Sequence, residues 1–425
     1  MDATRLLDSA SPEQREAVHR VAEHAAQLGL RAYVAGGAVR DAFLGRPVTD
    51  VDFVVAGDAI AFARGLAGAH GGEVVAHERF RTATWTIDAH RHDLASTRTE
   101  RYPRPAALPE VTTGVPIEAD LPRRDFSLNA MALRIDAPEL VDPLGGAADI
   151  RTRRVRALHP KSFIDDPTRI LRAARYVVRF GFDIDPETLD WLAEGVRHLP
   201  LVSGERLKYD IERMFSERAE PALALLAEWG VFHALGVPVP DGDLLRRRFE
   251  RMRAELARNP IPTDGLGLSP EDLINVAGWG ALIYNQGGFA ISRWIDRIPF
   301  PIAIRDALVD SGPLSTLSPN TLRGASVSEM SALMRGFSGA GLLLGFLYDS
   351  DSLKKRSALS EWSIWRHVRP IATGDDLRAL GLKPGPEFAR ILASLRDAWL
   401  DGKLSSADEE ALLLDRLVKG RALEP

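Results

Sequence analysis

The chain of 425 residues contains no cysteine, and this absence excludes disulfide bonds, thiolate zinc sites and iron–sulfur clusters. Long apolar runs are missing as well. The most apolar stretch, residues 339–348, is about half as long as a membrane-spanning helix. The N-terminus also lacks the apolar segment of a signal peptide. We therefore expect a soluble, cytoplasmic protein that binds no membrane.

An excess of positive charge is also lacking, because the formal net charge is −5. Any surface that binds nucleic acid must therefore be a local basic patch. The length exceeds one ordinary hydrophobic core, and 45% hydrophobic residues are enough to fill several cores. We expect roughly two to four domains.

Short apolar segments alternate with helical ones in the first third of the chain, which predicts an α/β head. Helices are expected over Pro12–Leu28, with Ser11 as N-cap, and over Asp58–His70. The expected strands are Arg31–Val34, Val51–Val55, Glu73–His77, Thr84–Ile87 and Ala130–Ile135. From about residue 160 strands vanish and the periodicity is helical almost to the C-terminus. We expect an N-terminal helix plus head at 1–150, a helical neck at 151–240, and a helical body and tail at 241–425.

Arg101–Pro122 contains five prolines and is predicted to be one long loop. Long loops inside compact domains are usually functional or disordered.

The most informative segment combines a glycine turn with paired carboxylates. Gly36 and Gly37 let the backbone approach a charged ligand, and free N–H groups in such a turn attract phosphate oxygens. Arg40 adds a permanent positive charge. Asp50 and Asp52 lie in an apparent strand, Thr49–Val55, where alternate side chains share one face and can bind the same metal ions. This combination predicts metal-assisted nucleotidyl transfer.

Two further groups are candidates for the same site. Asp93 is a possible third carboxylate from a neighbouring strand, and a surface position is an equally good interpretation. Arg123 and Arg124 follow the long loop and precede an apolar run, which would place them and Asp125 at the rim of a cleft. An ordinary exposed charge pair is the alternative.

A second constellation begins at Asp166-Pro167, a strong helix start in which the carboxylate caps and the proline opens the first turn. Arg169, Arg172 and Arg175 follow at intervals of three residues and form a slanted stripe. A capped helix with a solvated basic edge explains Asp166 but explains the arginines less well, because no acidic residue stands four positions from Arg172 or Arg175. In the functional interpretation, one carboxylate accepts from an exocyclic amine and one guanidinium donates to a ring acceptor. Such a pair selects C and A and rejects G and U without a nucleic-acid template.

These motifs together resemble the class II tRNA nucleotidyltransferases, the CCA-adding enzymes, which share a family with bacterial poly(A) polymerases. The resemblance is dense from residue 31 to residue 182 and weaker at 202–207 and 371–386. It rests on Gly36–Asp41, Leu44-Gly45, Asp50 with Asp52, Thr97–Tyr102, Arg123–Phe126, Asn129-Ala130, Asp142-Pro143 and Asp166–Arg175. It implies a polymerase-β-like α/β nucleotidyltransferase head followed by an all-α neck, body and tail.

The resemblance also implies roles for single residues. Gly37 and Arg40 would contact the nucleotide, and Asp50 and Asp52 would bind Mg²⁺. Arg124 and Asp125 would lie near the ribose. Facing the incoming base would be Asp166 and Arg169, with Arg172 and Arg175 supporting base and phosphates. The loop at 101–122 would help the change from C to A addition.

Some positions depart from the family pattern. Asp165 stands before Asp166 where glutamate is usual, Ser127 replaces a threonine, and Asp210 stands where glutamate is expected. The first departure makes the acid before Asp166 shorter than usual.

The function that we expect from the resemblance is addition of CMP, CMP and AMP to the 3′ end of tRNA from CTP and ATP. The tRNA would bind a basic neck surface formed by Arg151, Arg153, Arg154, Arg156, Lys161 and the arginine stripe. The body and tail at 241–425 would bind tRNA as well. No protein partner is implied. The alternatives are a poly(A) polymerase, an enzyme that adds only A or only CC, a small-molecule nucleotidyltransferase, and an inactive RNA-binding module. The retained loop argues against the CC-only form.

Overall fold

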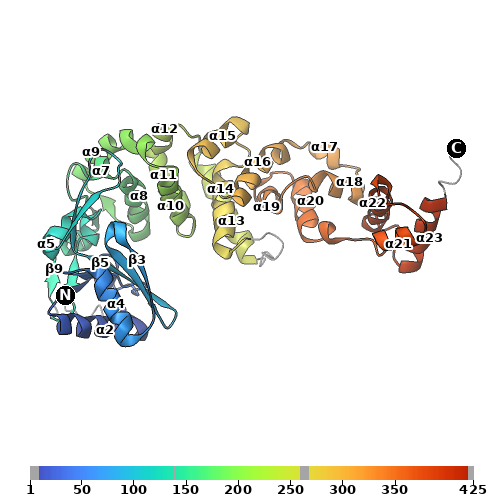
Figure 1. Ribbon diagram of the computed structural model, residues 1–425. Coiled ribbons are helices and arrows are strands. Elements are labelled where there is room, and N and C mark those ends of the chain that lie inside the picture. Colours follow the sequence, from blue (N-terminus) through green and yellow to red (C-terminus); the bar gives the residue numbers. More distant parts are fainter. Residues whose placement is uncertain (1–8, 138, 259–267, 420–425) are drawn as a thin grey trace. The chain divides into compact units, whose positions relative to one another are not determined.

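The computed structural model describes residues 9–137, 139–258 and 268–419 (Figure 1). The chain divides into two compact units, Met1–Leu235 and Gly236–Pro425. The finer division into head, neck and body with tail stays a prediction.

The first unit is built around a mixed sheet of seven strands in the order β3-β4-β5-β2-β1-β8-β9. Neighbours are antiparallel except β2 and β5, which are parallel. The strands of this sheet are β1 (Ala32–Ala35), β2 (Phe53–Val55), β3 (Glu73–His77), β4 (Thr82–Ile87), β5 (His90–Ser96), β8 (Ala132–Arg134) and β9 (Leu140–Val141). Two small sheets pair β6 (Arg98–Arg101) with β7 (Glu110–Thr113), and β10 (Arg154–Val155) with β11 (Asp183–Ile184).

Along the chain, the helices of the first unit lie before, between and after the strands of this sheet. They are α2 (Pro12–Leu28), α3 (Gly37–Phe43), α4 (Ala59–His70), α5 (Ile117–Asp120), α6 (Gly146–Arg151), α7 (Ser162–Asp165), α8 (Thr168–Phe180), α9 (Pro186–Gly195), α10 (Gly204–Phe215), α11 (Ala219–Glu228) and α12 (Val231–Leu235). The predicted bounds of α2 are confirmed, because Ser11 and Gln14 form a reciprocal capping box ahead of Pro12. Asp58 caps α4, as its carboxylate accepts from Ile60 N and Ala61 N.

Several predicted boundaries are wrong. The predicted strand Val51–Val55 begins only at Phe53, because from there on the chain has β1 on one side and β5 on the other. Asp50 and Asp52 therefore precede the strand. Strand β5 was not predicted, since its first four residues, His90 to Asp93, are all polar or charged and resemble a loop.

The long loop predicted at Arg101–Pro122 is partly regular structure. Strand β7 pairs back onto β6, and α5 begins directly after Pro116. One two-residue strand, β11, also lies beyond residue 160, where it pairs with β10. Helix α8 begins at Thr168, one residue later than predicted, although the Asp166 carboxylate still accepts from Thr168 N at 3.0 Å.

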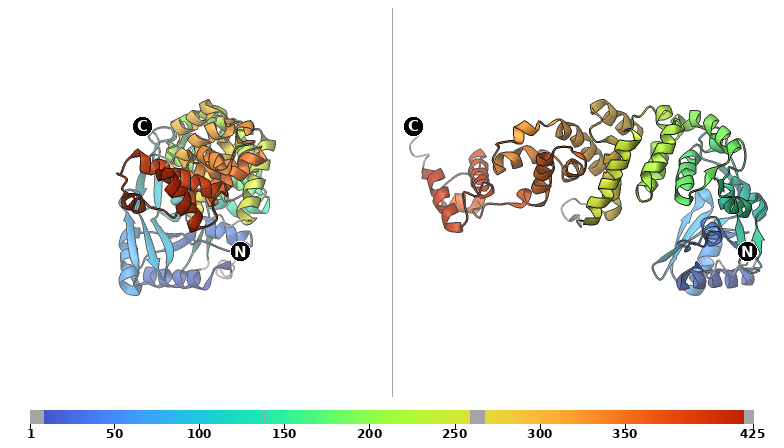
Figure 2. Two further views of the ribbon diagram at one scale, coloured as in Figure 1. Left: turned by 90° about the vertical axis from the view of Figure 1, so that its right-hand side faces the viewer. Right: turned by 180° about the vertical axis from the view of Figure 1, so that it is seen from behind.

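The described part of the second unit is helical, as the yellow-to-red chain in Figure 2 shows. Its helices are α13 (Gly242–Arg258), α14 (Pro270–Ile283), α15 (Gly288–Arg297), α16 (Ile302–Thr316), α17 (Pro319–Leu322), α18 (Val327–Met334), α19 (Gly339–Tyr348), α20 (Ser352–Ser363), α21 (Gly374–Ala379), α22 (Pro386–Leu400) and α23 (Ala407–Lys419). Among the described residues no single helix is long and apolar enough to cross a membrane, and only α18 with α19, bent by 110°, pass that test as a pair.

Candidate active site

One hollow of about 1000 Å³ in the first unit brings the predicted site residues together. Its walls come from the sheet, from the segment after the proline-rich region, and from helices α8 and α10. The predicted residues that line it are Gly37, Arg40, Asp50, Asp52, Asp93, Arg124, Asp125, Asp166, Arg169, Arg172 and Arg175. Residues separated by more than a hundred positions in sequence therefore share one cavity.

The glycine turn joins β1 to α3 at the edge of this hollow. Gly36 has a φ of +77°, and a Cβ at this position would stand 2.7 Å from Arg124 Nη1. The backbone conformation thus requires glycine, and the missing side chain lets Arg124 approach closely. The turn is also held in place, because Gly36 N donates to Met131 O at 3.0 Å.

Arg40 is held inside the protein and does not extend freely into the hollow. Its Nε and Nη2 each donate to the Asp41 carboxylate at 2.9 Å, and Nη1 donates to Asn129 Oδ1 at 2.6 Å. The guanidinium carbon also lies 4.8 Å from the centre of the Phe180 ring. Only 6% of Arg40 is exposed, so its main visible contribution is a fixed positive charge beside the glycine turn.

Asp50, Asp52 and Asp93 line the hollow together and form what we call its acidic floor. Because Phe53 pairs with Leu94, Asp52 and Asp93 occupy neighbouring positions on two parallel segments. Asp93 is fixed by Thr84 Oγ1, which donates to it at 2.6 Å. The surface of Asp52 opens onto the hollow, but protein surrounds its other sides. This partial loss of solvent, followed by the charges of Asp93 and Asp50, raises the pKa of Asp52.

Crowded carboxylates that repel one another fit a divalent cation. Carboxylate oxygens are hard ligands, and Mg²⁺ is usually bound by one or two of them together with water and substrate phosphates. Within the described ranges no three His, Asp or Glu side chains are arranged to hold a metal alone. Asp50 and Asp52 thus suit an ion that completes its shell with substrate oxygens.

Asp125 is almost fully buried and joins the head to helix α8. Its Oδ2 pairs with Arg172 Nη2 at 2.5 Å, and its Oδ1 accepts from Asn129 Nδ2 at 2.9 Å. Burial alone would raise the pKa of this carboxyl, but Arg172, the Asn129 hydrogen bond and Arg169 lower it. Asp125 is therefore an anionic anchor for α8.

Asp166 is oriented by an arginine that the sequence did not reveal. Arg206 Nη2, from α10, lies 2.5 Å from Asp166 Oδ1, and Thr168 Oγ1 donates to the same oxygen at 2.7 Å. Arg206 Nη1 also donates to Ala106 O at 3.2 Å. Ala106 N in turn donates to Ile164 O at 3.1 Å, so the proline-rich segment packs against the start of this helical region.

Arg169 is fixed from two sides. Its Nη1 donates to Ser162 Oγ at 2.7 Å, and its Nη2 donates to Arg123 O at 2.6 Å. Only 3% of Arg169 is exposed. The guanidinium is thus held in one orientation at the wall of the hollow.

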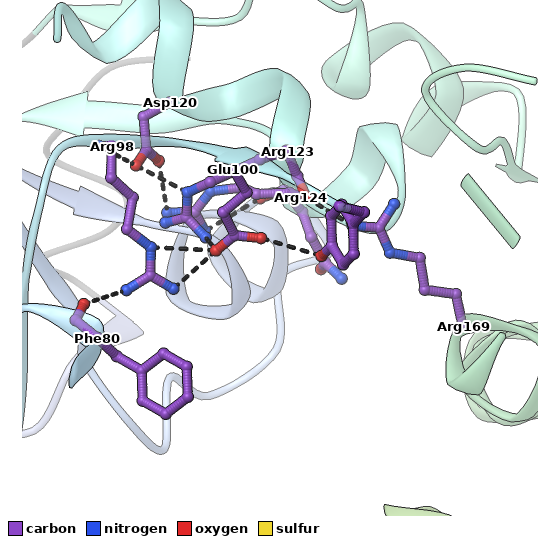
Figure 3. A network of polar contacts seen from close by, with 9 residues as sticks. Phe80, Arg98, Glu100, Asp120, Arg123, Arg124 and Arg169 are labelled. Carbon is purple, nitrogen blue, oxygen red and sulfur yellow. Dashed lines mark hydrogen bonds and ion pairs between the residues drawn. The ribbon is translucent and has the colours of Figure 1, made fainter. Parts of the chain in front are cut away.

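Figure 3 shows the ion-pair network behind Arg169. Glu100 Oε1 accepts from Arg98 Nη2 at 2.8 Å and from Arg123 Nη1 at 3.2 Å, and its other oxygen accepts from Tyr102. Asp120, which is fully buried, accepts from Arg123 Nε at 3.0 Å. The network connects the β6–β7 hairpin to Arg123, whose carbonyl oxygen accepts the hydrogen bond that positions Arg169.

Arg175 and Asp210 also line the hollow. Arg175 is buried, and its Nε and Nη1 have no hydrogen-bond partner among the described residues. Burial raises the pKa of Asp210 to about 6, although Arg172 and Arg175 oppose this effect. An unpaired buried guanidinium beside the hollow suits a negatively charged ligand.

The basic surface predicted for the neck is partly neutralised by acidic neighbours. Arg156 Nη2 pairs with Asp149 at 2.7 Å, and Arg154 Nη1 lies 3.3 Å from Asp185. Arg153 donates to Gly181 O at 3.0 Å. RNA would therefore have to compete with internal partners at these arginines.

Sequence reasoning missed Arg206 and Glu100 as parts of the site. Glu100 and Arg206 both lie in segments that carry the family resemblance, and this resemblance is the sequence signal that could have identified them. Asp210 stands out in the sequence only as a departure from the family pattern.

The chain is similar to known proteins both in its head and over most of its length. Residues 32–156 match the Poly A polymerase head domain. The chain is 39% identical over 387 residues to an A-adding tRNA nucleotidyltransferase of Halalkalibacterium halodurans, across 88% of this chain and 85% of that one. It is 32% identical over 386 residues to a CC-adding tRNA nucleotidyltransferase of Deinococcus radiodurans, across 89% and 87%. An A-adding relative from Geobacter sulfurreducens is 30% identical across 92% of this chain, which spans 46% of that protein. A solved CCA-adding enzyme in an apo form shares the fold, with a TM-score of 0.79, 24% identity and 99% of both chains covered.

The head fold, the glycine turn and the clustered carboxylates define a nucleotidyltransferase head followed by helical structure. At this level of similarity across most of both chains, the chain belongs to the tRNA nucleotidyltransferase family. Relatives in that family are named A-adding, CC-adding and CCA-adding enzymes. The family name therefore leaves the number and kind of nucleotides added open.

Proposed function

We propose that this enzyme adds CMP, CMP and AMP to the 3′ end of tRNA, using CTP and ATP and releasing pyrophosphate. The observation that carries the proposal is that Asp166 and Arg169 line the same hollow as Asp50 and Asp52. In such a cavity the donor–acceptor pair can select the base of a bound nucleotide, while the carboxylates serve the reaction at the phosphate of the same nucleotide. No nucleic-acid template is needed for that choice.

Asp50 and Asp52 are the proposed ligands for Mg²⁺. When bound, the ion would supply Lewis-acid stabilisation to the attacking and leaving oxygens. Arg124 places positive charge near the glycine turn, and the unpaired nitrogens of Arg175 can donate to phosphate oxygens. Gly37 leaves space for the nucleotide beside Arg40.

Asp166 and Arg169 are the proposed base-selecting pair. Each hydrogen bond to the Asp166 carboxylate ends on Oδ1, and across the described residues Oδ2 accepts none. Oδ2 can therefore accept from the amine of cytosine or adenine. Arg169 uses one N–H on each terminal nitrogen for the protein and keeps others for a ring acceptor. Guanine and uracil present the reverse pattern and would leave both groups unpaired.

A specific observation favours a second candidate, addition of the terminal A alone. The relative at 39% identity, over 88% of this chain, is an A-adding enzyme, whereas CC-adding relatives that cover most of the chain reach 32% and 34%. The same base-selecting pair serves either activity, because it accepts both C and A.

One experiment separates these functions. The purified protein is incubated with tRNA lacking its 3′ end and with tRNA ending in CC, together with each nucleoside triphosphate. Full activity extends the first substrate with CTP and then ATP. An A-adding enzyme extends only the second, and a CC-adding enzyme stops after two C residues. Extension of unrelated RNA by ATP with no use of CTP would instead identify a poly(A) polymerase.

A substitution tests the selecting role. Asp166→Ala should raise the incorporation of UTP and GTP relative to CTP and ATP more than it weakens tRNA binding. If selection stays intact, Asp166 serves only the start of the helix and the proposed pair is wrong.

A further inference from the structure

A second hollow lies wholly within the second unit and contains none of the residues assigned to catalysis. Its volume is about 310 Å³. Its walls come from α13, from the residues that follow α14, and from α16, α19 and α20. The residues that matter here are Arg247, Arg251, Tyr284, Asp349 and Lys355.

The carboxylate that lines this hollow is already satisfied. Asp349 Oδ2 accepts from Tyr284 Oη at 2.9 Å and from Lys354 Nζ at 3.1 Å. Its Oδ1 accepts from Asp351 N at 2.8 Å. Lys354 is buried and compensates the charge of this group, so Asp349 has little capacity to neutralise a further cation.

Positive charge in the hollow exceeds what its neighbours neutralise. Arg247 and Arg251 stand four residues apart on α13 and so share one face of the helix. Arg251 Nη2 donates to Phe346 O at 3.0 Å, but its buried Nε has no partner in the described structure. Burial, and then the charge of Arg251, lower the pKa of Lys355, while Glu255, Asp349 and Asp351 act more weakly in the opposite direction.

Arg248, in contrast to Arg247, has a structural role. It also lines the hollow, but its Nη1 donates to Ala281 O at 2.8 Å and its Nη2 to Tyr284 O at 2.7 Å. Those bonds join α13 to the end of α14. Arg247 and Lys355 make no ion pair within the described residues, and neither has such a packing role.

We propose that this hollow is a binding site for one phosphate group, held by Arg247, Arg251 and Lys355. Phosphate matches the site because two guanidinium groups and an ammonium group line it, and because the buried Arg251 Nε has no acceptor among the described residues. The group is a backbone phosphate of the RNA substrate, which rests on the proposed function, or a free phosphate ion.

The RNA arm of the test measures tRNA affinity against salt concentration. The variant is Arg247→Gln with Lys355→Gln, which removes charge without touching the hydrogen bonds of Arg248 or Asp349. Loss of one phosphate contact should lower the slope of log K against log salt by about one and weaken binding about tenfold at 0.1 M salt. Arg246→Gln is the matched control, because Arg246 is exposed on the same helix and already pairs with Asp243 and Glu250.

The second arm uses inorganic phosphate as the probe, titrated by calorimetry at constant ionic strength. A saturable component present in the wild type and lost in the double variant, with an unchanged tRNA slope, assigns the site to free phosphate. Unchanged tRNA binding and unchanged phosphate binding would overturn the proposal. Transfer activity is followed separately, so an inactive protein that keeps the salt effect contradicts the proposed function and not this site.

Discussion

Asp210 offers a quantitative test of the charge arrangement around the hollow. It is 7% exposed, and burial raises its pKa from the ordinary 3.8 to about 6. The folded protein thus binds this proton more tightly than the unfolded chain. The stability that this proton contributes is fully present below the ordinary pKa, falls as the pH rises toward 6, and is lost above 6.

The magnitude follows from linkage. At pH 5, one unit below the folded pKa, the protonated group stabilises the fold by about 1.4 kcal/mol relative to pH 7.5. Asp210→Asn removes this dependence, because the amide is neutral at both values. The ratio of the variant's folding equilibrium constant to that of the wild type should therefore rise about tenfold between pH 5 and pH 7.5.

Hydrogen exchange of amides in α8 and α10 measures this effect within the first unit alone. Comparing variant and wild type at the same pH cancels the intrinsic pH dependence of exchange. Asp190→Asn is the control, because Asp190 is an exposed carboxylate in the same unit. A ratio for Asp210→Asn that stays constant across this range would show that Asp210 ionises normally and that the arginines around it compensate its burial.

Three other substitutions test the site and its support. Asp52→Asn should reduce transfer about a thousandfold or more, ~4 kcal/mol, with tRNA binding retained; appreciable residual transfer would remove it from the metal site. Gly146→Ala should destabilise by about 1–3 kcal/mol in denaturation, since a Cβ would stand 2.2 Å from a backbone oxygen, whereas Gly68→Ala, with open space around it, should be neutral or stabilising. Glu100→Gln should lower the kcat/KM preference for CTP over UTP through loss of support for Arg169, and unchanged preference would limit Glu100 to a structural role.

The elements that could be predicted from the sequence are those determined by residues close to them in the chain. Ser11 and Pro12 determine where α2 begins, because the capping box and the proline act within one turn. The glycine turn was evident for the same reason, since only glycine tolerates the backbone at Gly36. Such features require no knowledge of the rest of the fold.

Elements that depend on distant partners were missed. Strand β5 carries charged residues on its exposed side, and it is a strand because β2 and β4 flank it. The β6–β7 hairpin forms although prolines lie between its strands. Arg206 is separated from Asp166 by 40 residues, so no spacing rule links them. Tertiary pairing, not local propensity, decides all three cases.

The arginine stripe on α8 combines two tasks that the sequence presents as one. Arg169 donates to the carbonyl of Arg123, and Arg172 pairs with Asp125, so successive turns of the helix are attached to one short segment of the head. Two nitrogens of Arg175, Nε and Nη1, instead have no hydrogen-bond partner in the described part of the chain. Substitution of Arg169 or Arg172 therefore disturbs the attachment of α8 as well as any contact with a nucleotide. Substitution of Arg175 should act mainly on nucleotide binding, because it has fewer internal bonds to lose.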